Sequence, residues 1–237
     1  MMCHRKSGAF IKAVLLSVMM AGIFPVASQA QGGVSLGATR VIYDQSDKQT
    51  SLSIMNSDPK TRYLVQSWVE DVQGKKTSDF IITPPLFIIN KKSENTLRII
   101  NTNDQLPKDR ETVYWLNTKA IPEVDKDNVD GKNVLQLAIL TRVKIFVRPK
   151  NIEMASSQAP GMLKFTASNG KLMIDNPTPY FVNMVNVKIA GQDVDAIMAA
   201  PKDKTTVTIP VAKPGKITYS TVTDFGAITS AMSATVN

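Results

Sequence analysis

Apolar and polar residues alternate along most of the chain, with the period of two that is typical of half-buried β-strands. Runs of this kind occupy residues 50–56, 63–72, 80–90, 95–101, 112–121 and 133–149. Turn-forming residues separate the runs, for example at 56–59 and at Gln73 and Gly74. No segment shows the longer period of an amphipathic helix. About seven short strands in succession predict an immunoglobulin-like β-sandwich.

A second group of strand-like runs follows Pro149, which ends the last run of the first group. The later runs lie at 163–169, 171–176, 181–190, 205–210 and 216–227. The stretch between the two groups is rich in Ser, Ala and Pro, which is typical of a linker. We therefore expect an all-β chain with an N-terminal immunoglobulin-like domain over 31–150, a linker over 151–156 and a smaller C-terminal immunoglobulin-like domain over 157–237.

The first 30 residues have the pattern of a secretory signal peptide. They begin with basic residues, continue with an apolar run over 13–23, and end with small residues at the two positions that a signal peptidase reads. The apolar run is short for a membrane span. We expect cleavage near Ala30, which leaves an exported chain of 207 residues without the only Cys and the only His of the sequence, Cys3 and His4.

The expected exported chain offers little for catalysis. Without Cys3 and His4 it has no thiol chemistry, no disulfides and no His or Cys metal site. Asp125, Asp127 and Asp130 resemble part of a calcium loop, but two lysines intrude and the glutamate that closes such a loop is missing, which favours a solvated hairpin loop. The sequence also contains no nucleophile motif and no phosphate-binding loop. We expect no enzyme activity, no cofactor and no metal site.

The charge of the exported chain is moderately basic. Loss of three basic residues at the start lowers the formal net charge from +8 to +5. Such a charge suits acidic partners, but the cations are scattered along the sequence rather than clustered, so the pattern does not indicate a nucleic-acid partner.

The run 133–149 is about three times as long as an ordinary strand, and it leaves two interpretations open. Leu135, Leu137 and Ile139 alternate on one face, whereas Gln136 and Ala138 on the other face are polar or small. An inner strand would bury the three apolar residues in the protein's own core. An edge strand would offer them to another protein by strand addition, in which backbone pairing gives affinity and alternate side chains enter pockets.

Pro84 and Pro85 interrupt the run 80–90. Proline cannot donate to a β-ladder, so the pair predicts a kink at a sheet edge or a switch of the strand to the other sheet.

Several short motifs resemble the periplasmic chaperones of chaperone–usher pili, in particular those that serve type 1-like fimbriae. They run in order over essentially all of the chain after residue 30: GVSLGATRVIY (33–43), TPPLF (83–87), ENTLRI (94–99), LPKDRE (106–111), YWLN (114–117), LQLAILTRVKIFVRP (135–149), NPTPYF (176–181) and TDFGA (223–227). The resemblance implies two sandwiches set at an angle with a cleft between them. It also implies a periplasmic protein that binds fimbrial subunits and delivers them to an outer-membrane usher, without a cofactor, a nucleic acid or a small-molecule substrate.

The same resemblance implies roles for named residues. A pilus subunit lacks the last strand of its fold, and the chaperone lends its own long strand, whose donor residues would be Leu135, Leu137 and Ile139. Arg40 and Lys144 would hold the terminal carboxylate of the subunit. Ile139 and Lys144 are five residues apart and fall on opposite faces of a flat strand. Either twist or a bulge re-aims Lys144, or the cleft opens on the other face at that depth.

Three further residues, Glu111, Arg148 and Asp224, match an ion-pair network between the domains of that family, which would set the geometry of the cleft. The rival interpretation is a secreted immunoglobulin-like adhesion or ligand-binding protein without an assembly function. Such a protein would bury the long strand in its own sheet and would have no use for paired cations at Arg40 and Lys144. A pilus subunit itself would be a smaller protein of one domain.

Overall fold

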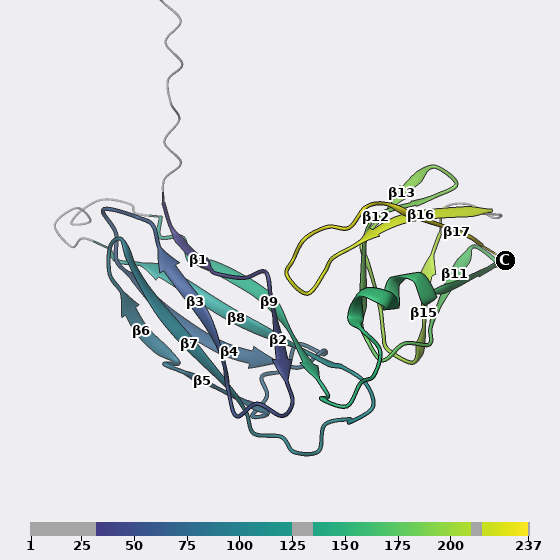
Figure 1. Cartoon of the computed structure of the whole chain (residues 1–237). Helices are drawn as coiled ribbons and strands as arrows, with labels where there is room; N and C mark the ends of the chain where they lie inside the picture. The colour runs from purple at the N-terminus through teal and green to yellow at the C-terminus, as the bar shows by residue number, and fades with distance from the viewer. Residues whose placement is uncertain (1–31, 125–134, 210–214, 237) are drawn as a thin grey trace, which may run out of the picture. The chain divides into compact units, whose positions relative to one another are not determined.

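The computed structural model describes residues 32–124, 135–209 and 215–236, and in these ranges the chain forms two β-sandwiches in succession (Figure 1). This confirms the all-β, immunoglobulin-like fold class. Among the described residues, no helix is long and apolar enough to span a membrane. The expected signal peptide at 1–30 lies outside the described residues.

The N-terminal sandwich consists of a four-stranded and a five-stranded sheet. The first sheet has the order β1 (Val34–Leu36), β3 (Thr50–Asn56), β7 (Ser93–Asn101) and β5 (Phe80–Thr83). The second has the order β2 (Arg40–Asp44), β9 (Ile139–Arg148), β8 (Thr112–Pro122), β4 (Tyr63–Glu70) and β6 (Leu86–Ile89). All pairings are antiparallel except the one between β2 and β9, which is parallel.

The core of this sandwich lies between its sheets and follows from the alternation in the sequence. Every second residue of β4 is buried, beginning at Tyr63, and the intervening residues face outward. Fully buried side chains from several strands meet in the middle, among them Tyr43, Ile54, Leu97, Leu116 and Ile145. Each buried aliphatic side chain contributes about 1.5–3 kcal/mol, so the core orders the strands without disulfides.

Two strands cross from one sheet to the other. The first strand does so between β1 and β2, where a Cβ on Gly37 would lie 2.0 Å from the Ser53 hydroxyl oxygen, so a larger residue there would force the Ser53 side chain to move. The second crossing confirms the strand switch predicted at Pro84 and Pro85, because β5 is an edge strand of one sheet and β6 is an edge strand of the other. The Thr83–Pro84 peptide bond is cis.

The C-terminal sandwich is smaller and has its own core. One sheet has the order β10 (Lys164–Ser168), β11 (Lys171–Asn176) and β15 (Asp203–Thr208). The other has the order β13 (Gln192–Val194), β12 (Val182–Ile189), β16 (Lys216–Thr221) and β17 (Met232–Thr235), and β14 (Ile197–Ala199) also pairs with β12. Leu172, Ile174, Met184, Ile189 and Ile217 are fully buried between these sheets.

A 3₁₀ helix, Ser156–Met162, lies between β9 and β10, where the sequence predicts a linker that ends at 156. The helix packs on the C-terminal sandwich, because Ala159 is buried in its core and the Tyr219 hydroxyl donates to the Pro160 carbonyl oxygen over 2.9 Å. The alternation in the sequence does not extend through 156–162, which is why the pattern alone indicates a linker there.

Both sandwiches contain the same buried asparagine turn. The Asn56 amide nitrogen donates to two carbonyl oxygens and its oxygen accepts from the Asp58 backbone N–H. Asn176 repeats this arrangement, with two carbonyl acceptors and the Thr178 backbone N–H as donor. Because each Asn side chain has its hydrogen bonds satisfied, it holds the turn that follows β3 or β11 without a cost for its burial. The repeat is spatial, and the sequence shows no duplication.

Candidate functional site

Strand β9 carries both of the side-chain sets that the sequence singles out. Its register with β8 is continuous from Thr112 opposite Val147 to Ala120 opposite Ile139, without a shift. The odd positions Val143, Ile145 and Val147 are buried in the core of the N-terminal sandwich, and Ile139 has the same parity. The even positions face the opposite side of the sheet. Lys144 is therefore not re-aimed by a bulge, and it lies on the opposite face from Ile139.

The strand is shorter than the predicted run 133–149. It begins at Ile139, and residues 135–138 are described but belong to no strand, whereas 133 and 134 lie outside the described residues. The end of β8 explains why β9 does not begin earlier. Strand β8 ends at Pro122, and proline has no N–H to donate at the position where the ladder would continue. The Gln136 side chain instead donates to the Pro122 carbonyl oxygen over 2.8 Å.

The three proposed donor residues are exposed. Leu135, Leu137 and Ile139 expose 81%, 68% and 52% of their surface. On the side away from β8, the neighbouring strand β2 begins at Arg40, which is paired with Lys144. Within the part of the chain that the structure describes, the segment 135–143 therefore has no ladder partner on that edge. The interpretation in which the protein buries these residues in its own core does not describe this structure.

Arg40 and Lys144 lie directly opposite each other in the parallel pairing of β2 with β9. Lys144 Nζ donates to Asn183 Oδ1 over 2.6 Å, and Arg40 Nη1 donates to the Val222 carbonyl oxygen over 3.2 Å. Both partners are neutral and belong to the C-terminal sandwich. The Trp115 ring lies beneath Lys144, with Nζ 5.4 Å from its centroid.

The two cations are partly desolvated and lack a counter-ion in this arrangement. Burial lowers the pKa of Lys144, and the nearby charge of Arg40 lowers it further. Burial also lowers the pKa of Arg40, although the charges of Asp224 and Glu111 act in the opposite direction. The buried Nε of Arg40 has no hydrogen-bond partner, and neither cation forms an ion pair among the described residues. The geometry therefore suits an anion that binds both groups.

Arg148 joins two carboxylates that lie far apart in the sequence. Its Nε donates to Glu111 Oε1 over 2.8 Å, and its two Nη atoms donate to the two oxygens of Asp224 over 2.8 and 2.9 Å. Glu111 is only 4% exposed and also accepts from the Phe181 backbone N–H, while Asp224 accepts from the Ser156 hydroxyl. The structure thus brings the three predicted network residues together.

The two carboxylates respond differently to this environment. Burial raises the pKa of Glu111 and outweighs the attraction of Arg148. Burial acts on Asp224 in the same direction, but its hydrogen bonds from Arg148 and Ser156 outweigh burial and lower the pKa of Asp224. Burial would lower the pKa of Arg148, but its bonds to Asp224 and Glu111 reverse this and raise it. Arg148 is therefore charged at neutral pH.

The loop between β16 and β17 carries residues that sequence reasoning missed. Figure 1 shows this loop in yellow, extending toward β9 and β2. Gly226 lies against Thr39, since a Cβ at Gly226 would be 2.4 Å from the Thr39 hydroxyl oxygen. The neighbouring Phe225 is 98% exposed, although Asp224 beside it is held by Arg148. Asn183 and Val222, the partners of the two cations, were also missed, because a hydrogen bond between segments so far apart in sequence leaves no local pattern.

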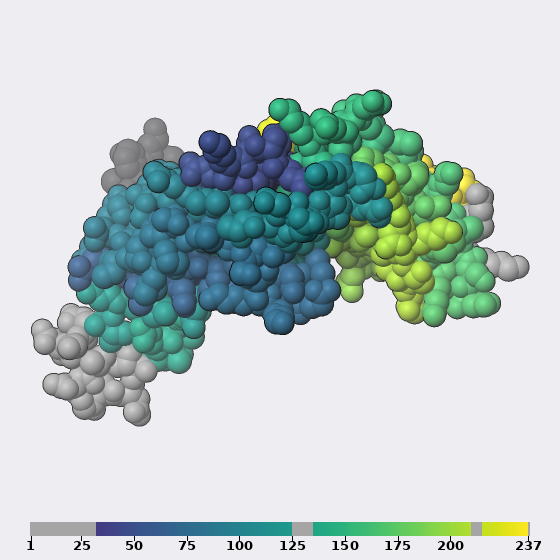
Figure 2. All heavy atoms as spheres, turned by 90° about the horizontal axis from the view of Figure 1, so that it is seen from below, coloured from purple at the N-terminus to yellow at the C-terminus, as the bar shows by residue number. Residues whose placement is uncertain are grey.

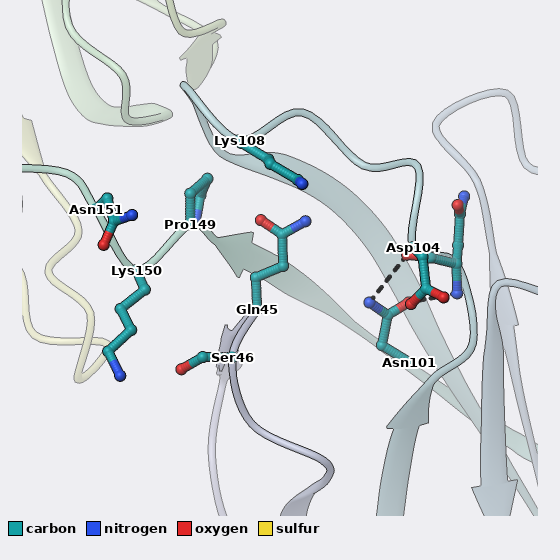
Figure 3. A pocket seen from close by; sticks show the side chains of 9 residues that line it. Gln45, Ser46, Asn101, Asp104, Lys108, Pro149, Lys150 and Asn151 are labelled. Atoms are coloured by element: carbon teal, nitrogen blue, oxygen red, sulfur yellow. Dashed lines mark hydrogen bonds between the residues drawn. The ribbon is translucent and has the colours of Figure 1, made fainter.

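Two pockets lie near these residues. A pocket of about 440 Å³ is bounded by the Glu111, Arg148 and Asp224 network, by Asn183 and Val222, and by apolar side chains that include Tyr180, Phe181, Val182 and Phe225. A second pocket, of about 350 Å³, is polar and is formed by Gln45, Ser46, Lys108, Lys150 and neighbouring residues (Figure 3). In that pocket Gln45 donates to the Leu106 carbonyl oxygen, and Asn101 donates to the Asn103 carbonyl oxygen.

A further contact joins the loop before β8 to the C-terminal sandwich. In Figure 2 this teal segment touches the green surface formed by later residues, and the ion pair of Asp109 with Lys202, at 2.9 Å, belongs to it. Both side chains are substantially exposed, so the pair contributes little to stability.

Comparison with known protein families decides the identity of the chain. Residues 33–153 match the model of the pili and flagellar-assembly chaperone, PapD N-terminal domain, and residues 158–233 match that of the pili assembly chaperone PapD, C-terminal domain. The chain belongs to the pilus-assembly chaperone family.

Known pilus chaperones are similar to this chain over nearly its whole length. The chaperone protein FocC of Escherichia coli is 46% identical over 95% of this chain and 99% of its own, and FimC of Escherichia coli strain K12 is 42% identical over 96% and 95%. The crystal structure of the periplasmic chaperone SfaE has a TM-score of 0.75 at 44% identity over 85% and 98% of the two chains. The SafB chaperone, solved in complex with the Salmonella enterica SafA pilin, has a TM-score of 0.78 at 30% identity over 88% and 98%.

These matches establish a chaperone of pilus assembly, and they do not favour the rival adhesion protein. The acidic residues Asp125, Asp127 and Asp130 lie outside the described residues. In the described ranges, no group of three or more His, Cys, Asp or Glu residues is arranged to hold a metal ion.

Proposed function

We propose that the chaperone binds fimbrial subunits in the periplasm, completes their fold with residues 135–143, and passes them to an outer-membrane usher without catalysing a reaction. The observation that carries this proposal is the free edge of β9 beside exposed apolar residues. Leu135, Leu137 and Ile139 project where β2 does not reach, so a partner strand can pair with the backbone there and cover the side chains. An uncovered edge of this kind would otherwise promote aggregation.

The cation pair supports a terminal carboxylate as the second contact. Arg40 and Lys144 lie next to the free edge along β9, and each donates directly to a neutral oxygen rather than to a carboxylate. A carboxylate between them would accept charge-assisted hydrogen bonds from the two cationic groups. Since the carboxylate would be fixed at one position along β9, it would also set the register of the strand that is bound.

Ile139 and Lys144 lie on opposite faces of β9, and this is compatible with a donor role for Ile139 and a carboxylate-binding role for Lys144. Ile139 has the inward-facing parity of β9, and Leu135 and Leu137 continue the same alternation in the sequence before the strand begins. The three donor residues would fill the groove of a subunit beyond the end of the chaperone's own core. Lys144 belongs to the other face, which faces Asn183 of the C-terminal sandwich. The bound strand pairs with the edge, and its terminus turns toward that sandwich.

We assign the network of Glu111, Arg148 and Asp224 to the geometry of this site. Arg148 and Lys144 lie on the same face of β9, four residues apart, and Asp224 lies two residues after Val222, the partner of Arg40. Fixing Asp224 therefore fixes the backbone that positions Arg40. Buried ion pairs are weak contributors to net stability, which also favours a positioning role.

Two relatives support the proposed localisation and the proposed subunit partners. SfaE is named a periplasmic chaperone and SafB was solved with a pilin, and both are similar to this chain over most of its length. The pattern of residues 1–30 suits export. The direct test is purification from periplasm of cells that also express the fimbrial subunits. We expect the chaperone to elute with one subunit per chaperone, and a chaperone that elutes without any subunit would contradict the proposal.

A further inference from the structure

The loop over residues 222–229 is held rigidly from several directions. Asp224 accepts two hydrogen bonds from Arg148 and one from Ser156. Within the loop, the Gly226 N–H donates to the Thr223 carbonyl oxygen and the Thr223 N–H donates to the Ala227 carbonyl oxygen. Gly226 has a φ of +82° and lies against Thr39. Little freedom remains for the backbone of the residue between Asp224 and Gly226.

That residue is Phe225, which the rigid loop holds in solvent with 98% of its surface exposed. Single exposed apolar residues are ordinary on protein surfaces. Phe225 differs because Ile228 on the same loop is also exposed, and because Phe225 stands at the rim of the pocket of about 440 Å³, whose wall includes Phe181, Val182 and Val222. An aromatic side chain on a pre-ordered loop loses little conformational entropy when it is covered.

The pocket is joined to the cation pair by two hydrogen bonds. Lys144 donates to Asn183 and Arg40 donates to the Val222 carbonyl oxygen, and both acceptor residues line the pocket. One end of the site is therefore cationic and partly desolvated, while the adjoining wall and rim are apolar. The complement of such a site is a chain terminus that carries a carboxylate and an apolar side chain on the same residue.

We infer that Phe225 and this pocket receive the side chain of the last residue of the captured subunit, so that the chaperone prefers subunits that end in a bulky apolar or aromatic residue. The inference rests on the proposed function, because it places the terminal carboxylate between Arg40 and Lys144. It adds a specificity determinant on the C-terminal sandwich to a site whose other contacts lie on the N-terminal sandwich.

Synthetic peptides test this directly on the full exported chain. We would use fluorescein-labelled hexapeptides of alternating Thr and Val with a free carboxylate, ending in either Phe or Ala, and measure Kd by fluorescence anisotropy. We expect the Phe-ending peptide to bind about tenfold more tightly, which is the size of effect typical of a well-packed aromatic contact. The Phe225→Ala variant should lose that preference, Phe225→Leu should keep part of it, and Ile81→Ala, at an exposed apolar residue of β5, should keep all of it.

An amidated version of each peptide separates this inference from the function on which it rests. If amidation weakens binding but the last side chain has no effect on the wild-type Kd, the carboxylate site stands and the inference is overturned. If Phe225→Ala weakens the Phe-ending and Ala-ending peptides equally, Phe225 acts elsewhere and the inference is again overturned. If amidation has no effect on either peptide, the proposed carboxylate site itself is wrong. Since Phe225 is almost fully exposed, unchanged thermal unfolding of the variants is expected and would verify folding.

Discussion

Arg40 and Lys144 face each other across the pairing of β2 with β9, and each donates its hydrogen bond to a neutral oxygen rather than to a carboxylate. Two like charges in a partly desolvated position repel, and each lowers the stability of the other's charged form. The chaperone tolerates this arrangement four residues away from Arg148, which by contrast is paired with two carboxylates. This difference supports the proposal that Arg40 and Lys144 bind an anion of a partner, whereas Arg148 is paired within the chain.

The first prediction concerns the exposed donor segment. Leu137→Asp places a charge where an apolar groove should be filled, so the variant should fold normally but fail to retain subunits. Far-UV circular dichroism and co-purification from periplasm measure the two properties. Ile81→Asp, which changes an exposed apolar residue of β5 in the same way, should retain subunits. Unfolding of the Leu137 variant would show that Leu137 belongs to the chaperone's own core.

The second prediction concerns the position of Asp224. Asp224→Asn removes the charge that Arg148 binds with two hydrogen bonds, and a charged hydrogen bond contributes about 1.5–3 kcal/mol when it is shielded. Because the Asp224 side chain is 30% exposed, we expect a smaller loss, about 1–2 kcal/mol, with each sandwich still folded. Solution scattering should report a wider range of arrangements of the two sandwiches, and subunit binding should weaken. Asp193→Asn, at a surface ion pair with Lys188, is the matched control and should change neither.

The pH dependence of stability gives a third prediction. The pKa of Asp224 is lower in the folded chaperone than its ordinary value, so its ionised form stabilises the fold above the ordinary carboxyl pKa of about 4, and this contribution is lost as the pH falls through the lowered value. Glu111 acts in the opposite direction, since its pKa is raised, but it is present in both proteins compared. The difference in unfolding free energy between the wild type and Asp224→Asn should therefore be largest near neutral pH and shrink in acid. Urea unfolding measures it, and a difference that grows in acid would contradict the assignment.

The fourth prediction uses Gly226. An alanine there is strained by the φ of +82° and by the Thr39 hydroxyl oxygen, whereas Gly191 has a φ of +83° and open space around it. Gly226→Ala should therefore destabilise the chaperone more than Gly191→Ala, which is expected to cost about 1 kcal/mol. Thr39→Ala in the same chain should remove the excess. Equal costs for the two glycine variants would mean that the loop does not press against Thr39.

Much of the architecture could be predicted from local sequence. Alternation located most strands of both sandwiches because a half-buried strand repeats every two residues, and Pro84 and Pro85 located a strand switch because proline cannot continue a ladder. The start of β9 was predicted too early, since residues 135–138 have the apolar alternation of a strand without a partner strand to pair with. The 3₁₀ helix at Ser156–Met162 was missed for the opposite reason, because its contacts with the second sandwich leave no periodic pattern.

Less of the candidate site than of the fold could be predicted from local sequence. Composition and spacing could not choose between a buried and an offered strand at Leu135–Ile139 or bring Arg40 to Lys144, and the resemblance to a family supplied both. Asn183 and Val222 contact the two cations, and Phe225 lines the adjoining pocket, through contacts between residues far apart in the sequence. The roles of the donor residues, the cation pair and the Arg148 network remain predictions.

The central claim is that Lys144 and Arg40 bind the terminal carboxylate of a subunit, and a double-mutant cycle tests it most directly. The dissociation constant of the chaperone–subunit complex would be measured for wild type and Lys144→Ala, each with a natural and a C-terminally amidated subunit, with Lys164→Ala at an exposed residue of β10 as the control. Losing one partner of a shielded charge pair costs about 2–5 kcal/mol in binding. We predict that amidation weakens the wild type and the control by at least about thirtyfold yet scarcely affects Lys144→Ala, because the contact is already lost. Fully additive effects of amidation and Lys144→Ala would contradict the claim.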